Sequence, residues 1–136
     1  MAEHPTAAGS RHVSVVVSAS PEQVYAFAAE PDNLHRWASG LAQAQVRRDG
    51  DLLQVQSPMG IVTVQFVGPN TLGVLDHTVT LPDGTATLNP VRVVPHPEGA
   101  EIVFTVRQLA MTVDEFAHDC RTVAGDLARL AGLVEG

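Results

Sequence analysis

The carboxyl-terminal segment is the feature that most constrains how this chain can fold. It opens with Thr112 and Glu115 in a T-x-x-E capping box, and apolar side chains then recur at alternating steps of three and four residues. This spacing over roughly 25 residues predicts one helix of about six turns with a single apolar face. The face consists of Val113, Phe116, Cys120, Val123, Leu127, Leu130 and Val134.

The charged residues of the same segment fall between its apolar positions. We therefore expect them to form a solvated face on the other side of the helix, while the apolar face packs against a sheet. The charged residues are Asp114, Glu115, Asp119, Arg121, Asp126 and Arg129.

Most of the remaining chain consists of apolar runs between short polar turns, which predicts strands. Asp49-Gly50 is typical of a tight hairpin turn, because both positions tolerate positive φ. Strands joined by such short turns pair antiparallel, since a parallel pair needs a long crossover. The seven expected strands are His12–Ser18, Ala42–Arg48, Leu52–Gln56, Ile61–Val67, Leu72–Leu81, Thr85–Val94 and Glu101–Leu109.

Two short helices are expected directly after the first strand. Ser20 and Gln23 form an S-x-x-Q capping box, and Pro21 occupies the first helical position, where its missing N–H costs nothing. Pro31 ends this helix and begins a second one, which carries Trp37.

The order of elements indicates a single α+β domain over residues 1–136, a usual length for one domain. A seven-stranded antiparallel sheet has only one long helix to cover it, and a strongly twisted sheet can curl around that helix. The two short helices would then close one end. Because one helix cannot fill so wide a concave face, we expect an internal apolar cavity. Residues 1–11 precede the first expected strand, and we expect them to be flexible.

Composition argues against several classes of function. The net charge of -7 is unfavourable for a broad nucleic-acid-binding face. No apolar run approaches the roughly 20 residues that span a bilayer, and residues 1–11 lack the apolar core of a signal peptide. The single cysteine, Cys120, agrees with a reducing compartment. We therefore expect a cytoplasmic protein, either a monomer or a homodimer.

Two stretches near the amino end carry a resemblance to a known family. The segment V-x-V-x-A-S-P-E-Q-V-Y-A-F, the segment P-D-N-L-x-R-W and the closing amphipathic helix resemble the START-like SRPBCC superfamily, and within it the bacterial polyketide cyclase/dehydrase group. The resemblance covers about Val13 to Val134. It implies a helix-grip fold with a deep apolar ligand cavity. Because this superfamily includes lipid carriers, hormone receptors, aromatase/cyclases, hydrolases and co-chaperone-like domains, the resemblance names no ligand.

His77 is the candidate catalytic residue. It shares one strand face with Leu75, Val79 and Leu81, and this apolar face is expected to look into the cavity, whereas Asp76 should point away. A histidine there is suited to acid/base catalysis near neutral pH, or to a hydrogen bond with a ligand carbonyl. The alternative is a histidine with a purely structural role in the core or at the cavity rim.

Asn89 and Trp37 are the other polar or amphipathic candidates for ligand binding. Asn89 is expected to face inward and Arg92 outward, although Pro90 can mark a bulge that shifts the alternation. The resemblance implies that the helix carrying Trp37 closes the cavity mouth; the alternative is simple packing of that helix against the sheet edge. The expected apolar contacts are Phe66, Phe104, Phe116, Cys120 and Val123.

Three functions fit these features. The first is binding of a hydrophobic small molecule with polyketide cyclase/dehydratase-like chemistry, in which a cavity orients a reactive chain. The second is a non-catalytic carrier or sensor, and the third is a protein-interaction module whose cavity is filled by its own side chains. The six histidines lack metal-site spacing, and no glycine-rich phosphate loop or Ser/His/Asp motif is present, so neither a metal nor a cofactor is expected.

Overall fold

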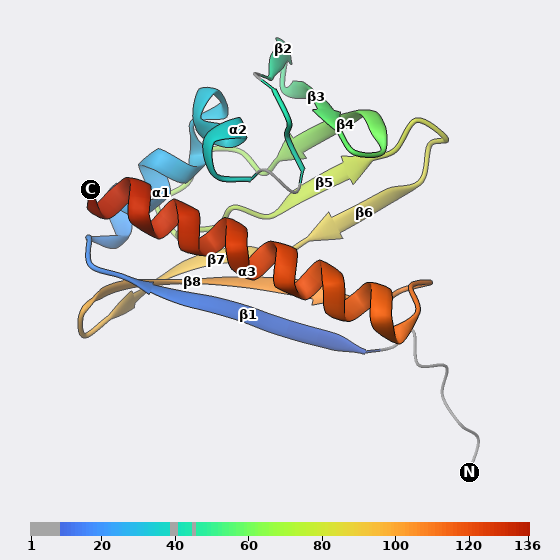
Figure 1. Ribbon diagram of the computed structural model, residues 1–136. Helices are drawn as coiled ribbons and strands as arrows, with labels where there is room; N and C mark the ends of the chain where they lie inside the picture. The colour runs from blue at the N-terminus through green and yellow to red at the C-terminus, as the bar shows by residue number, and fades with distance from the viewer. Residues whose placement is uncertain (1–8, 39–40, 45) are drawn as a thin grey trace.

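The computed structural model describes residues 9–38, 41–44 and 46–136. Two antiparallel sheets and a long carboxyl-terminal helix form the protein (Figure 1). The elements are, in chain order, β1 (Ser10–Val17), α1 (Pro21–Ala29), the 3-10 turn η2 (Pro31–Asn33), α2 (Leu34–Trp37), β2 (Arg47–Asp49), β3 (Leu52–Ser57), β4 (Gly60–Phe66), β5 (His77–Thr80), β6 (Ala86–Asn89), β7 (Val91–His96), β8 (Gly99–Arg107) and α3 (Val113–Glu135).

Both predicted capping boxes are present. The Ser20 hydroxyl accepts a hydrogen bond from the Gln23 backbone N–H at 3.1 Å, and the Gln23 side chain accepts one from the Ser20 N–H. Thr112 and Glu115 make the same reciprocal pair at the start of α3. Each pair satisfies backbone donors that a helix start would leave unpaired, so both helices begin where the sequence predicts.

The described residues form eight strands, one more than expected, because the predicted strand Thr85–Val94 breaks at Pro90. Pro90 has no N–H to donate to a ladder, and the chain changes sheet there. β6 belongs to a five-stranded sheet with the order β2-β3-β4-β5-β6, whereas β7 belongs to a three-stranded sheet with the order β1-β8-β7. The predicted class, α+β with curved antiparallel strands around a long helix, is confirmed.

The side chain of Asp76 joins the two sheets at this break. Its Oδ1 accepts hydrogen bonds from the Val91 backbone N–H and from Arg92 Nε, both at 2.9 Å, and its Oδ2 accepts one from Arg92 Nη2 at 2.8 Å. The ion pair with Arg92 holds the pKa of Asp76 below its ordinary value. This bidentate pair links the residue before β5 to the first residues of β7.

Three predicted boundaries are corrected. Leu72–Asp76 is not regular strand, and in this segment only an isolated bridge joins Val74 to Arg92. In the segment 42–48 the strand is confined to its end, at Arg47–Asp49, and residue 45 lies outside the described residues. Residues 1–8 also lie outside the described part of the chain, but Ser10 and Arg11 belong to β1 and pair with Arg107 and Val106 on β8.

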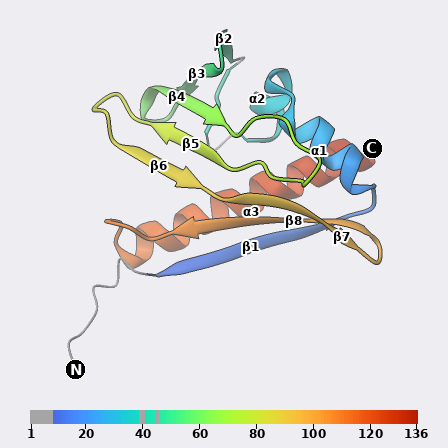
Figure 2. The ribbon, with the colours of Figure 1, turned by 180° about the vertical axis from the view of Figure 1, so that it is seen from behind.

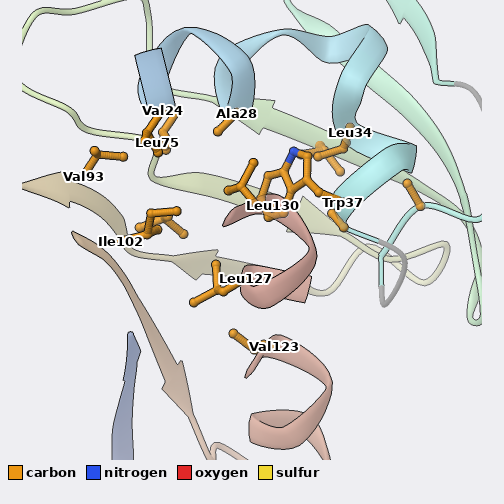
Figure 3. Close-up of a cluster of buried hydrophobic side chains, with 14 of the residues drawn as sticks. Val24, Ala28, Leu34, Trp37, Leu75, Val93, Ile102, Val123, Leu127 and Leu130 are labelled. Atoms are coloured by element: carbon orange, nitrogen blue, oxygen red, sulfur yellow. The ribbon is translucent and has the colours of Figure 1, made fainter. Parts of the chain in front are cut away.

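α3 packs against β1 and β8, with α1 and α2 beside its carboxyl-terminal half. Seen from behind, β7 and β8 pass in front of this helix, and β4 and β5 of the five-stranded sheet lie above it in the view (Figure 2). Near the carboxyl end of α3, Leu127 and Leu130 pack with Ile102 and Trp37 in a cluster that β7, β8, α1 and α2 also enter (Figure 3). The helix is thus anchored on the three-stranded sheet, and the five-stranded sheet stands opposite it.

Gly73 offers a test of the close approach between the loop before β5 and β7. Its φ is +74°, and an added Cβ would overlap the carbonyl oxygen of Val93, whose N–H donates to Gly73 O at 2.8 Å. Gly84 has a similar φ of +91°, but nothing lies within 4 Å of its Cβ position. We expect Gly84→Ala to lower the free energy of unfolding by about 1–2 kcal/mol, and Gly73→Ala to lower it by more than about 3 kcal/mol. Urea unfolding measures the free energy of unfolding of both variants. Equal decreases for the two variants would show that the approach of Gly73 to Val93 is not tight.

Candidate functional site

A cavity of about 750 Å³ is lined by residues from α2, β4, β5, β6, β8 and α3. It lies where α3 faces the five-stranded sheet rather than packing on it. Its lining is predominantly apolar, and side chains from both sheets, α2 and α3 contribute to it. The apolar residues include Leu34, Trp37, Phe66, Val79, Phe104 and Val123.

His77 lines this cavity and is almost completely buried, with 4% of its surface exposed. Its ring lies between two phenylalanines, with the ring centroid 4.8 Å from that of Phe66 and 5.9 Å from that of Phe104. Leu75 and Val79 are buried on the same side, as the alternation predicts. The aromatic contacts hold the imidazole ring in one orientation.

The hydrogen bonding of His77 defines its tautomer. Nδ1 lies 3.1 Å from the Leu75 carbonyl oxygen, and because a carbonyl only accepts, Nδ1 carries the proton. Burial lowers the pKa of His77, which favours the neutral ring at pH 7. Nε2 is then a lone-pair acceptor, and it has no hydrogen-bond partner within the described residues. The ring thus presents a neutral base with one free acceptor.

Asn89 lies directly opposite His77 on the neighbouring strand, because the register of β5 and β6 pairs these two residues. It is half-buried and lines the cavity. Arg92 is exposed and paired with Asp76 on the outer side. Pro90 therefore breaks the strand without reversing the predicted facing of Asn89 and Arg92.

Trp37 lines the cavity from α2 and is 4% exposed. Its carbonyl oxygen accepts a hydrogen bond from Arg129 Nη1 at 2.9 Å, which ties α2 to α3. Its indole Nε1 is buried and lacks a partner among the residues that the structure describes. The position of Trp37 is thus compatible with both expected roles, lining the cavity and packing α2 against its neighbours.

Phe116 and Cys120 are placed in the core, not in the cavity lining, unlike Phe66, Phe104 and Val123. The reason is the orientation of α3: the face that carries these two residues turns toward the three-stranded sheet. Arg11 on β1 lies over the Phe116 ring, with its guanidinium carbon 5.5 Å from the ring centroid. This corrects the expectation that they contact a ligand.

The lining also contains polar residues of α3 that the sequence assigns to a solvated face. Asp119 and Asp126, both expected on that face, border the cavity together with Thr122, and Asp126 is only 9% exposed. Their spacing of three and four residues places them on one side of the helix. This spacing is the only sequence pattern that could have identified these residues as cavity-lining. The apolar stripe of α3 does not show that a second side of the helix faces a cavity.

Asp119 and Asp126 differ in their surroundings. The carboxylate of Asp126 accepts a hydrogen bond from Arg129 Nη1 at 3.0 Å. Asp119 is half-buried and is joined to no described residue by a hydrogen bond or an ion pair. Burial raises the pKa of Asp119, the charge of Asp126 raises it further, and nearby His118 opposes the shift. Of these two carboxyl groups, that of Asp126 is paired and that of Asp119 is not.

Within the described ranges, no three His, Cys, Asp or Glu side chains gather closely enough to hold a metal ion. No helix in the described part of the chain has the length and apolar character that crossing a bilayer requires.

An antiparallel sheet curved around one long helix, with a cavity between them, defines the helix-grip class of proteins. The chain belongs to the polyketide cyclase/dehydrase and lipid transport family, whose sequence pattern it matches over residues 10–132. This confirms the resemblance carried by the two amino-terminal segments and the last helix. No curated protein matches the chain in sequence.

Solved structures agree in fold. The Aha1 dimer of Colwellia psychrerythraea is 16% identical with a TM-score of 0.75, and the match covers 93% of this chain and 96% of that one. A protein of Chromobacterium violaceum is 16% identical with a TM-score of 0.66, covering 93% and 98% of the two chains. DynU16, from the dynemicin biosynthetic locus, is 16% identical with a TM-score of 0.71, covering 93% of this chain and 47% of DynU16.

The burial of His77 predicts a pH dependence of stability. The unfolded chain binds a proton at the ordinary pKa near 6.5, whereas the folded chain binds it only at lower pH. Below pH 6.5 the unfolded state therefore holds more protons, and the free energy of unfolding falls as the pH falls, by at most about 1.4 kcal/mol per pH unit for one proton. Above that pH the contribution is constant.

His77→Gln should remove this slope. Urea unfolding of wild type and variant between pH 5 and pH 8 gives the difference in unfolding free energy at each pH. We expect the difference to be constant above about pH 7 and to move in favour of the variant as the pH falls. A difference that does not change with pH would mean that His77 protonates equally well in the folded protein.

Proposed function

We propose that this protein binds an apolar small molecule in the cavity between the five-stranded sheet and α3. The observation that carries the proposal is a cavity of about 750 Å³ whose lining is largely apolar and includes a nearly buried histidine with a free acceptor. Ligand sites in proteins are typically of this kind, with apolar walls and a few convergent polar groups. Membership of the family supports the same function.

The cavity volume argues against an interaction module filled by its own side chains. Protein interiors are close-packed, and spaces larger than a few water molecules are rare in them. The largest apolar groups nearby, such as Trp37 and Phe104, border the space without filling it. A ligand-binding protein is therefore the better account of the same architecture.

Within this function, His77 is the group that we propose for proton transfer. Its Nε2 is unprotonated when Nδ1 donates to Leu75, so it is able to accept a proton from a bound molecule. Asn89, across the ladder, is placed to hold a polar group of the ligand beside it. This arrangement suits a dehydration or ring closure that begins with proton removal, the chemistry for which the family is named.

Filling the cavity should abolish ligand binding without affecting the fold. Thr87 lines the cavity from β6, while its neighbour Leu88 points outward and is 53% exposed. We expect Thr87→Phe to weaken binding of the neutral fluorescent probe Nile red by at least about tenfold, because the new ring occupies space that the probe needs. Leu88→Phe, the matched control, should bind as wild type does. Equal binding by both variants would place the probe elsewhere.

A catalytic role for His77 is tested with the small-molecule extract of the protein's own host. Purified wild type is incubated with the extract, and masses are followed by chromatography and mass spectrometry. We expect a component to lose one water or to change retention at constant mass, and His77→Gln to leave it unchanged while still binding Nile red. An extract that wild type leaves unaltered, from which it nevertheless retains one component, would indicate a carrier.

A further inference from the structure

Two acceptor groups on opposite walls of the cavity have no protein partner among the residues that the structure describes. The first is Nε2 of His77, whose ring is 4% exposed and faces the cavity from β5. Nδ1 is committed to the Leu75 carbonyl oxygen, so Nε2 has only a lone pair to offer. Nε2 is not among the buried side-chain atoms that lack a partner, so it is open to the cavity, and a ligand that covers it without a donor would leave it unpaired at a cost. A ligand relieves that cost only by presenting an O–H or N–H group.

The second acceptor is the carboxyl group of Asp119 on α3, on the helix side of the same cavity. It is half-buried, and it makes no hydrogen bond or ion pair with any residue that the structure describes. A carboxylate accepts on both oxygens and donates from neither. Since His77 and Asp119 come from opposite walls, a ligand in the cavity meets an acceptor on either side.

The charged residues around the cavity also favour a neutral or cationic ligand over an anionic one. Its lining holds the acidic residues Asp114, Glu115, Asp119 and Asp126, against Arg107 as the only permanently charged cation among the described lining residues. His118 also borders the cavity, and Arg129 neutralises Asp126. The whole chain has a net charge of -7. An anionic group entering the cavity would therefore meet repulsion from this excess of acidic residues.

We propose that the cavity selects apolar molecules that carry a hydroxyl or amine donor, and that it discriminates against organic anions such as carboxylates. This inference rests on the proposed function, because it names the ligand class of the same cavity. A neutral hydroxyl or amine donates to His77 Nε2 and an ammonium group pairs with Asp119. Free fatty acids should bind poorly, since their headgroup would bring a further negative charge into a lining that already holds four acidic residues.

Four naphthalenes of nearly equal shape test the proposal by calorimetric titration at pH 7. 2-Naphthol has a donor, 2-methoxynaphthalene has the same oxygen without one, 2-naphthylmethylamine is a cation and 2-naphthoic acid is an anion at this pH. We expect 2-naphthol to bind about fivefold more tightly than its methyl ether, the worth of one hydrogen bond. The amine should bind at least about tenfold more tightly than the naphthoate.

Two variants test which residue causes the preference for a donor and which causes the preference for a cation. His77→Phe keeps a ring between Phe66 and Phe104 but removes the acceptor, so the preference for naphthol over its ether should disappear. Asp119→Asn removes one charge and should shrink the gap between amine and naphthoate by at least about threefold, with the naphthol preference unchanged. Asp51→Asn makes the same charge change in the turn before β3, outside the cavity lining, and should leave all four affinities as in wild type.

The outcomes separate this inference from the function on which it rests. If all four compounds bind equally, or the naphthoate binds best, the cavity binds ligands but the donor preference is wrong. If none of them binds and Nile red does not bind either, the proposed function fails and this inference fails with it. If His77→Phe does not fold, as judged by circular dichroism, the comparison of Asp119→Asn with Asp51→Asn still decides the charge preference.

Discussion

A single helix has to serve two sheets in this protein, and most of the structure depends on that constraint. α3 packs against β1 and β8 of the three-stranded sheet, and its carboxyl-terminal half is further held by Arg129, which joins it to the carbonyl oxygen of Trp37. A helix fixed in this way cannot also pack on the five-stranded sheet that stands opposite. The space that remains is a consequence of the architecture, because side chains at normal packing density cannot bridge it.

The same constraint makes the junction between the sheets important for the site. The chain crosses from one sheet to the other at Pro90, immediately after Asn89 and immediately before the residues that Asp76 holds. Asp76 bonds to the Val91 N–H and to the Arg92 guanidinium, and it precedes His77 by one residue. Neighbouring strand residues face opposite ways. The ion pair between Asp76 and Arg92 on the outer side therefore helps to fix the backbone from which His77 and Asn89 face the cavity.

Sequence patterns predicted the elements that rest on local chemistry. The capping boxes, the proline between the short helices and the length of α3 depend on residues close together in the chain, and each was expected within a few positions. The inward facing of Leu75, His77 and Val79 follows from strand alternation alone. What local patterns did not indicate is the change of sheet at Pro90, because a proline within a strand is equally compatible with a bulge, an edge or a break.

The second buried side of α3 was unpredictable for a related reason. A helix between two sheets is buried on two sides, but the apolar stripe marks only the side that packs. Asp119 and Asp126 border the cavity with polar groups, and the sequence pattern assigned them to a solvated face. Distinguishing the two requires knowing where the five-stranded sheet stands, which depends on contacts between residues far apart in the chain.

Neither Nε2 of His77 nor the carboxyl group of Asp119 makes a hydrogen bond or ion pair with the described part of the chain. An apolar residue of similar size at either position would avoid the cost of partly desolvating a polar group. Elsewhere Asp76 and the two capping boxes pair their polar groups, whereas the buried Nε1 of Trp37 and Nδ1 of His35 lack a partner among the described residues. Because His77 and Asp119 present acceptors from opposite walls of one cavity, a bound molecule with a hydrogen-bond donor would offset the cost of leaving them unpaired.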